Sequence, residues 1–249
     1  MIEIVADAEA LALRTAELFT ATAQRATKTQ GVFRVALSGG GTPRRCYELL
    51  AASPFLEQIP WSTVEIFWGD ERCVPRDDPR SNAHMTREAL LSQVPLAAEQ
   101  IHPLYEAGDP AAAAQNYERL LGDFFGKNEP GFDLVLLGLG EDGHTASLFP
   151  GSPAREEKER WVRVTQRPGE EIFRLTLTLP ILNRAAQVIF LVAGASKTAI
   201  LHQVLAGNEV DPPLPAQLIR PQPGELLWLV DRAAAGDLSS SPIEEIVLK

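Results

Sequence analysis

The chain has 249 residues, of which 45% are hydrophobic and 22% charged, and its net charge is −10 at pH 7. This composition is typical of a folded domain and excludes a disordered chain. The acidic balance, without any run of five basic residues, disfavours nucleic acid and anionic membranes as partners. There is no stretch of 18 apolar residues and no signal-peptide pattern at the N-terminus. We therefore expect one cytoplasmic domain, residues 1–249, that binds a small molecule.

Apolar runs of strand length alternate with helical patterns along the chain. The expected strands are 32–37, 64–68, 132–137, 188–192 and 226–230, and the expected helices are 7–28, 43–52, 81–91, 109–125 and 196–206. Most of the strands are continuously apolar, which is typical of strands buried on both faces. The pattern predicts an α/β fold, a three-layer, mostly parallel, Rossmann-like sheet with helices on both faces. Ligands of such sheets bind in the loops beyond the carboxyl ends of the strands.

The first of these loops is rich in glycine. It reads Ser38-Gly39-Gly40-Gly41-Thr42-Pro43 and leads into an expected helix. Backbone N–H groups exposed at the start of a helix attract an anion, so the loop could hold a phosphate. No Gly-Lys-Ser/Thr follows it, which disfavours a nucleoside triphosphate. A tight strand-to-helix turn without a ligand is the alternative interpretation.

The loop after the third strand carries a histidine. Residues 138–144 have the G-x-G-x-x-G spacing of dinucleotide-binding loops. Two acidic residues, Glu141 and Asp142, would face the pyrophosphate, so we reject that interpretation. A catalytic turn is favoured instead, because it brings Asp142 and His144 to the end of a buried strand. An imidazole there can serve as a general base.

Charged residues follow the other strands. Asp70, Glu71 and Arg72 come after the second strand and could form a solvated charged turn, while Arg174 and Lys197 could be ordinary surface charges. An anionic ligand of this acidic chain would need local cations, because distant charges are screened. No H-E-x-x-H, C-x-x-C or paired-histidine spacing occurs, so the sequence gives no support for a metal centre.

Several segments together resemble the 6-phosphogluconolactonase family. They are 37–43, 68–75 with Ser81-Asn82, 138–150, 174–178 and 194–197, so the resemblance runs almost from end to end. The resemblance implies a cofactor-free hydrolase whose partner is a phosphorylated sugar lactone. It would convert 6-phospho-D-glucono-1,5-lactone to 6-phospho-D-gluconate in the oxidative pentose phosphate pathway.

The resemblance also implies roles for single residues. His144 would be the general base for direct attack of water, and Asp142 would orient the turn. Arg72 would contact the substrate and stabilise an oxyanion, and Asp70 joins the catalytic group. The phosphate would be bound by Ser38, Gly39, Gly40, Thr42, Arg174 and Lys197. The roles of Arg44, Arg76 and Arg80 stay open.

Two alternatives belong to other functional classes. The first is a glucosamine-6-phosphate deaminase/isomerase, whose motif after the histidine reads like Ile-Ala-Phe-Asn-Glu-Pro, with a proton-transferring glutamate before the proline. In this chain Phe149 precedes Pro150, and a phenyl ring cannot transfer a proton. The second is a non-catalytic sugar-phosphate sensor, which the lack of a DNA-binding extension disfavours.

Overall fold

The computed structural model describes residues 1–126, 131–206, 212–240 and 246–248. Within these residues, a large sheet of seven parallel strands has the order β10-β1-β9-β8-β5-β2-β3. Its strands are β1 (Ile2–Val5), β2 (Phe33–Leu37), β3 (Val64–Trp68), β5 (Leu134–Gly138), β8 (Gln187–Val192), β9 (Glu225–Asp231) and β10 (Ile246–Leu248). The five expected strands therefore form its centre and one edge.

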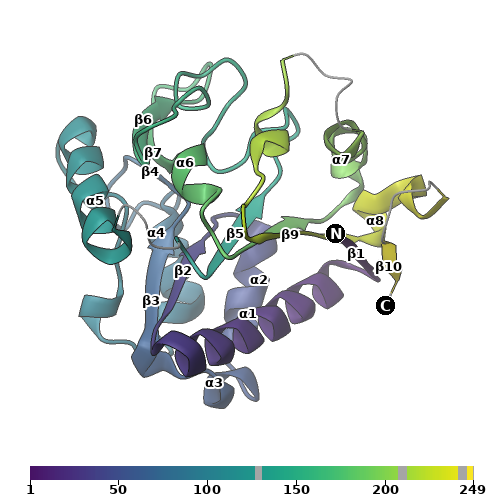
Figure 1. The fold of residues 1–249 in the computed structure, drawn as a ribbon, viewed down its shortest axis with the longest axis horizontal. Helices are drawn as coiled ribbons and strands as arrows, with labels where there is room; N and C mark the ends of the chain where they lie inside the picture. The colour runs from purple at the N-terminus through teal and green to yellow at the C-terminus, as the bar shows by residue number, and fades with distance from the viewer. Residues whose placement is uncertain (127–130, 207–211, 241–245, 249) are drawn as a thin grey trace.

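Helices cover both faces of this sheet. They are α1 (Ala8–Gln30), α2 (Gly41–Leu50), α3 (Phe55–Gln58), α4 (Asn82–Thr86), α5 (Pro110–Phe125), α6 (Leu179–Leu182), α7 (Thr198–Leu205) and α8 (Arg232–Ala235). Figure 1 shows α1, α2 and α3 below the sheet, and α6 and α7 above it. The predicted three-layer α/β fold is confirmed. No helix among the described residues is long and apolar enough to cross a membrane.

A second, antiparallel sheet was not predicted. Its three strands, in the order β4-β7-β6, are β4 (Asp70–Arg72), β6 (Val162–Gln166) and β7 (Phe173–Leu177). Residues 70–72 were placed in a loop, with a solvated charged turn as the alternative interpretation, but they are a strand paired with β7. Charged residues and short length hid these strands from an analysis based on apolar runs.

The remaining differences concern the ends of elements. β1 and β10 were missed because they have only four and three residues. The expected helix 81–91 begins as α4 and continues as a π-helical turn, Arg87–Leu91. The expected helix 196–206 begins with a 3-10 turn, Ala195–Lys197, before α7. Lys197 is the last residue of that turn, which follows closely on the end of β8.

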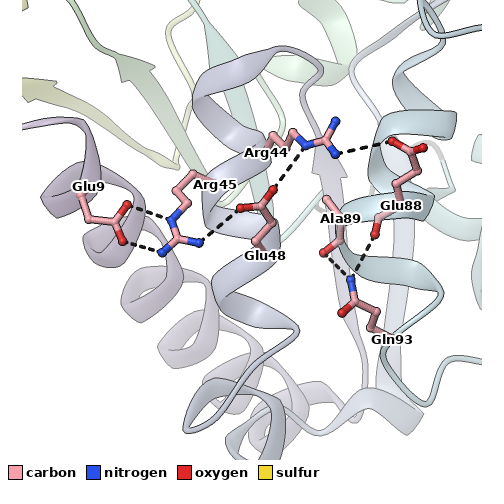
Figure 2. Close-up of polar contacts among 7 residues, drawn as sticks. All are labelled: Glu9, Arg44, Arg45, Glu48, Glu88, Ala89 and Gln93. Atoms are coloured by element: carbon pink, nitrogen blue, oxygen red, sulfur yellow. Dashed lines mark hydrogen bonds and ion pairs between the residues drawn. The ribbon is translucent and has the colours of Figure 1, made fainter.

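Surface ion pairs join the helix that follows the glycine loop to its neighbours. Arg45 of α2 pairs with Glu9 of α1 at 2.8 Å and with Glu48 at 3.2 Å. Arg44 pairs with Glu48 at 3.3 Å and reaches Glu88 of the π-helical turn at 3.5 Å (Figure 2). Single exposed pairs contribute little to stability, but together they link α2 on both sides.

Candidate active site

Two adjoining hollows lie where the carboxyl ends of β2, β5 and β8 meet. The larger encloses about 220 Å³ and the smaller about 170 Å³, and they share Ser38, Gly39 and Lys197. The larger is lined by Ser38, Gly39, Asp70, Arg72, Asn82, Gly138, Leu139, Gly140, His144, Ala146, Arg174 and Lys197. The smaller adds Gly40, Gly41, Thr42 and Pro43. Every expected site residue therefore lines one of the two hollows except Asp142, which contacts the ring of His144.

The glycine loop begins at a buried tyrosine. The Tyr47 hydroxyl accepts a hydrogen bond from the Ser38 N–H at 3.0 Å and donates one to the Ser38 carbonyl at 2.8 Å. Gly39 lies so close to Asn82 that a β-carbon there would fall 1.8 Å from Asn82 Oδ1. Gly40 has a φ of 108°, which favours glycine, and directly precedes α2. The loop is therefore held with its backbone against the hollow.

The histidine turn is closed by its own backbone and pairs an imidazole with a carboxylate. Gly140 donates its N–H to the His144 carbonyl at 2.9 Å. The Asp142 carboxylate accepts from the His144 N–H at 3.1 Å and also contacts the ring Nδ1. Burial raises the pKa of Asp142, but these hydrogen bonds outweigh it and keep the pKa below its usual value. An ionised Asp142 requires the proton on Nδ1, which leaves Nε2 as the basic nitrogen.

Phe149 lies between His144 and Arg174. Its ring is fully buried, and its centroid is 4.8 Å from that of His144. The Arg174 guanidinium lies over the same ring at 5.4 Å from its centroid. Glu170 holds the outer end of Arg174 through a bond of 2.7 Å. Phe149 therefore packs against two residues that line the larger hollow.

The Asp70 carboxylate is buried and held by two neighbours. Ser147 donates its hydroxyl to Oδ2 at 2.5 Å, and Asn82 donates its amide to Oδ1 at 3.1 Å. Asn82 also donates to the Asp70 carbonyl at 2.8 Å. Ser147 is in turn tied to β7, because its N–H donates to the Thr176 hydroxyl at 3.1 Å. Asp70 thus connects the histidine turn with α4.

Glu71 links the adjacent elements through hydrogen bonds to its carboxylate. Its buried carboxylate accepts from the N–H groups of Arg72, Asn82 and Ala83 at 2.7, 2.8 and 2.7 Å, and from the Ser81 hydroxyl at 3.0 Å. Burial raises the pKa of Glu71, although these four hydrogen bonds oppose the shift. Glu71 therefore joins β4 to the start of α4 and faces away from the hollow.

Three cations border the larger hollow. The Nε atoms of Arg72 and Arg174 are buried and have no hydrogen-bond partner among the described residues. Arg72 also donates through Nη1 to the Arg80 carbonyl at 2.5 Å. Lys197 forms no ion pair with any residue that the structure describes. These three side chains can therefore donate to an anion.

The three arginines whose roles were open lie outside this set. Arg44 is bound by two glutamates (Figure 2), and Arg80 pairs with Asp78 at 2.6 Å. Neither these two nor Arg76 is among the described residues that line the two hollows. Nothing in their placement supports a role in phosphate binding.

Other reactive groups do not reach the site. His84 is paired with Glu88 at 3.5 Å, and His102 with Glu65 at 2.7 Å. Burial and the charge of Glu71 raise the pKa of Cys73 to about 12, so its thiol stays protonated at neutral pH. Within the described part of the chain, no three His, Cys, Asp or Glu side chains are grouped to hold a metal.

Tyr47 and Glu170 escaped the sequence interpretation, while Glu71 and Ser147 lay in segments that it quoted but received no role. Each acts by holding another residue of the site in place. Asn82 was noticed only as part of the resemblance. Such supporting residues carry no motif of their own, because their role depends on which residue of the site they contact.

Comparison with known proteins identifies the class. Residues 6–228 match the family model described as glucosamine-6-phosphate isomerases/6-phosphogluconolactonase. The chain therefore belongs to this family.

Within the family, curated relatives carry one particular name. A 6-phosphogluconolactonase of Nostoc sp. is 43% identical over 96% of this chain and 98% of its own, and one of Synechocystis sp. is 44% identical over 95% and 98%. The solved structure of 6-phosphogluconolactonase from Trypanosoma cruzi is 30% identical, with a TM-score of 0.83 over 96% of each chain. The expected resemblance and the expected enzyme class are confirmed.

A solved monomeric glucosamine-6-phosphate deaminase has a similar fold. Its TM-score is 0.79 at 20% identity, over 94% of this chain and 98% of its own. At that identity the likeness shows the shared fold alone. The residues of the site must therefore distinguish the two activities.

We predict that Gly140→Ala disrupts the His144–Asp142 pair and lowers the activity. A β-carbon at Gly140 would fall 2.0 Å from His144 Nδ1 and 2.7 Å from Asp142 Oδ1, so the pair must separate. We expect kcat for lactone hydrolysis to fall on the order of 10- to 1000-fold, part of the usual contribution of a general base. Gly122→Ala is the control, because a β-carbon there meets no atom within 4 Å. Equal kcat values for the two variants would contradict the assignment.

Proposed function

We propose that this chain, as a single domain, hydrolyses 6-phospho-D-glucono-1,5-lactone to 6-phospho-D-gluconate with His144 as general base. The observation that carries the proposal is the His144–Asp142 pair in a hollow bordered by Arg72, Arg174 and Lys197. A base beside a cationic anion site suits a neutral ester group attached to a phosphate. The names of the relatives support the same substrate.

The first chemical step is attack of water on C1 of the lactone. The neutral Nε2 of His144 takes a proton from the water as its oxygen bonds to C1. Asp142 accepts from the opposite ring nitrogen and stabilises the imidazolium that forms. The ring is held between Gly140 and Phe149, so it needs little reorientation during the step.

Collapse of the tetrahedral intermediate opens the ring. The C1 oxygen of the intermediate is negatively charged and is stabilised by a charged hydrogen-bond donor. We assign this role to Arg72, because its buried Nε has no partner among the described residues. The imidazolium returns its proton to the ring oxygen as the C1–O bond breaks. The product is the open-chain acid, and no covalent enzyme intermediate forms.

The phosphate anchors the substrate at the opposite side of the hollow. We assign it to the backbone of Ser38, Gly39 and Gly40, the Thr42 hydroxyl, and the cations Lys197 and Arg174. The N-terminus of α2 and charged donors both favour a dianion. Asp70 is buried with both oxygens occupied, so we assign it to positioning the turn and α4.

Phe149 distinguishes this chemistry from that of a deaminase. The ring occupies the place of the proton-transferring glutamate and is fully buried. Its contacts with His144 and Arg174 leave no group at this position that could open a sugar ring. The site supports a lactonase and not an aldose–ketose isomerisation.

The activity itself can be tested by comparing two substrates. With freshly generated 6-phosphogluconolactone we expect acid release in a pH-stat, above the rate without enzyme. With glucosamine 6-phosphate we expect no ammonia. Ammonia from the second substrate, or no acid from the first, would overturn the proposed function. EDTA should leave the rate unchanged, because the proposed base is a side chain.

We predict that His144→Asn lowers kcat on the order of 10²- to 10⁴-fold, the usual contribution of general-base catalysis. Asparagine keeps the size and some hydrogen bonding but cannot accept the proton. Binding of 6-phosphogluconate should survive in calorimetry. A variant with parental kcat would show that the base lies elsewhere.

We predict that Lys197→Ala weakens substrate binding by about 1.5–3 kcal/mol, roughly ten- to 150-fold, as for a hydrogen bond to a charged group. The measurement is KM for the phosphorylated lactone. Lys158→Ala is the control, because Lys158 is exposed and lines neither hollow. If KM for Lys197→Ala stays within twofold of the control, Lys197 does not bind the phosphate.

A further inference from the structure

A buried carboxylate of the large sheet has no role in the mechanism described above. Asp231 is the last residue of β9 and is 4% exposed. β9 pairs with β8, with Val230 opposite Val192, so Asp231 lies next to the loop by which the chain leaves β8. The turn Ala195–Lys197 follows that loop, and Lys197 lines both active-site hollows. Asp231 itself lines neither hollow.

The Asp231 carboxylate holds the start of that turn. Its two oxygens accept from the Gly194 N–H, at 3.0 Å for Oδ1 and 3.1 Å for Oδ2. Gly194 has a φ of 93°, a conformation that glycine adopts at little cost. The Gly194 carbonyl in turn accepts from the Lys197 N–H at 3.0 Å. Two consecutive hydrogen bonds therefore connect Asp231 with the backbone of Lys197.

The same carboxylate caps α8. Asp231 Oδ1 also accepts from the Ala234 N–H at 2.7 Å, as an aspartate before the first residue of a helix commonly does. α8 is bonded to the start of α7, because the Thr198 hydroxyl donates to the Ala233 carbonyl at 3.0 Å. Thr198 directly follows Lys197. Asp231 therefore supports the backbone on both sides of Lys197.

Two other aspartates cap helices without such a connection. Asp7 caps α1 and Asp109 caps α5, and each accepts from a helical N–H at 2.8 Å. Both are exposed, so capping a helix does not require burial. Burying a carboxylate costs free energy unless hydrogen bonds offset the cost. Asp231 differs from both by its burial and by its bond to the loop that leaves β8.

We propose that Asp231 is a positioning residue for phosphate recognition, which fixes the turn after β8 and so holds Lys197 at the active-site hollow. This role rests on the proposed function, in which Lys197 binds the 6-phosphate. A lysine side chain is flexible, and ordering it on binding costs free energy. A fixed backbone lowers that cost. Loss of the hold should weaken substrate binding and leave the step at C1 unchanged, because His144 lies on another turn.

Asp231→Asn tests the proposal while keeping the helix cap, since asparagine caps as well as aspartate. Its amide NH₂ replaces an oxygen that accepts from the Gly194 N–H, so two donors would face each other. We expect KM for 6-phosphogluconolactone to rise roughly three- to tenfold, about the effect of one net hydrogen bond, with kcat within about twofold of the parent. Asp109→Asn, the same change at an exposed cap, is the matched control and should leave both constants unchanged.

Asp231→Ser provides a second variant in case the asparagine variant does not fold. Serine is also a favoured cap, but its single short-chain oxygen replaces the two carboxylate oxygens that hold Gly194. We expect the same rise in KM with kcat retained. Circular dichroism should show parental secondary structure for both variants. A fall in kcat with KM unchanged would overturn the proposal.

A double-mutant cycle shows whether Asp231 acts through Lys197. In a Lys197→Ala background, Asp231→Asn should raise KM by no more than about twofold, because the group that it positions is gone. An equal rise in both backgrounds would overturn the proposal. If Lys197→Ala raises KM and the Asp231 variants do not, only the role of Asp231 fails. If Lys197→Ala leaves KM unchanged, the proposed phosphate site fails and the role of Asp231 fails with it.

Discussion

The parallel pairing of β2, β5 and β8 is the constraint on which the site depends. Parallel strands bring their carboxyl ends to one edge of a sheet, and here these ends carry the glycine loop, the histidine turn and the loop before Lys197. The pairing brings together groups that are far apart in sequence. Because all three strands are buried, their ends are fixed in position, and the groups that follow them inherit that rigidity.

The small antiparallel sheet completes the site from the other side. β4 carries Asp70 and Arg72, and β7 carries Arg174, so one sheet supplies two of the three cations. Its buried carboxylates are expensive to remove from water and are held by several hydrogen bonds each. Glu71 and Asp70 therefore tie β4 to α4 and to the histidine turn. The hydrogen bonds that these carboxylates accept offset the cost of burying them.

The charge of the molecule is unevenly distributed over the described residues. An acidic chain would repel a phosphorylated substrate at long range, but at physiological salt the screening length is about 8 Å and nearby cations dominate. Such cations line the active-site hollow and the hollow between α5 and β6.

The sequence by itself determined that five buried strands alternate with helices in a mostly parallel sheet, and it identified the loops that hold His144, Lys197 and the glycines. Continuous apolar runs report burial on both faces, and glycines and histidine at strand ends report loops with chemistry. Only the tertiary structure decided that residues 70–72 form a strand, that Phe149 packs between His144 and Arg174, and that Glu170 and Ser147 hold site residues. The pairing of β4 with β7, the contact of Phe149 with Arg174 and the Ser147–Asp70 hydrogen bond join segments that are distant in sequence, which local periodicity cannot encode.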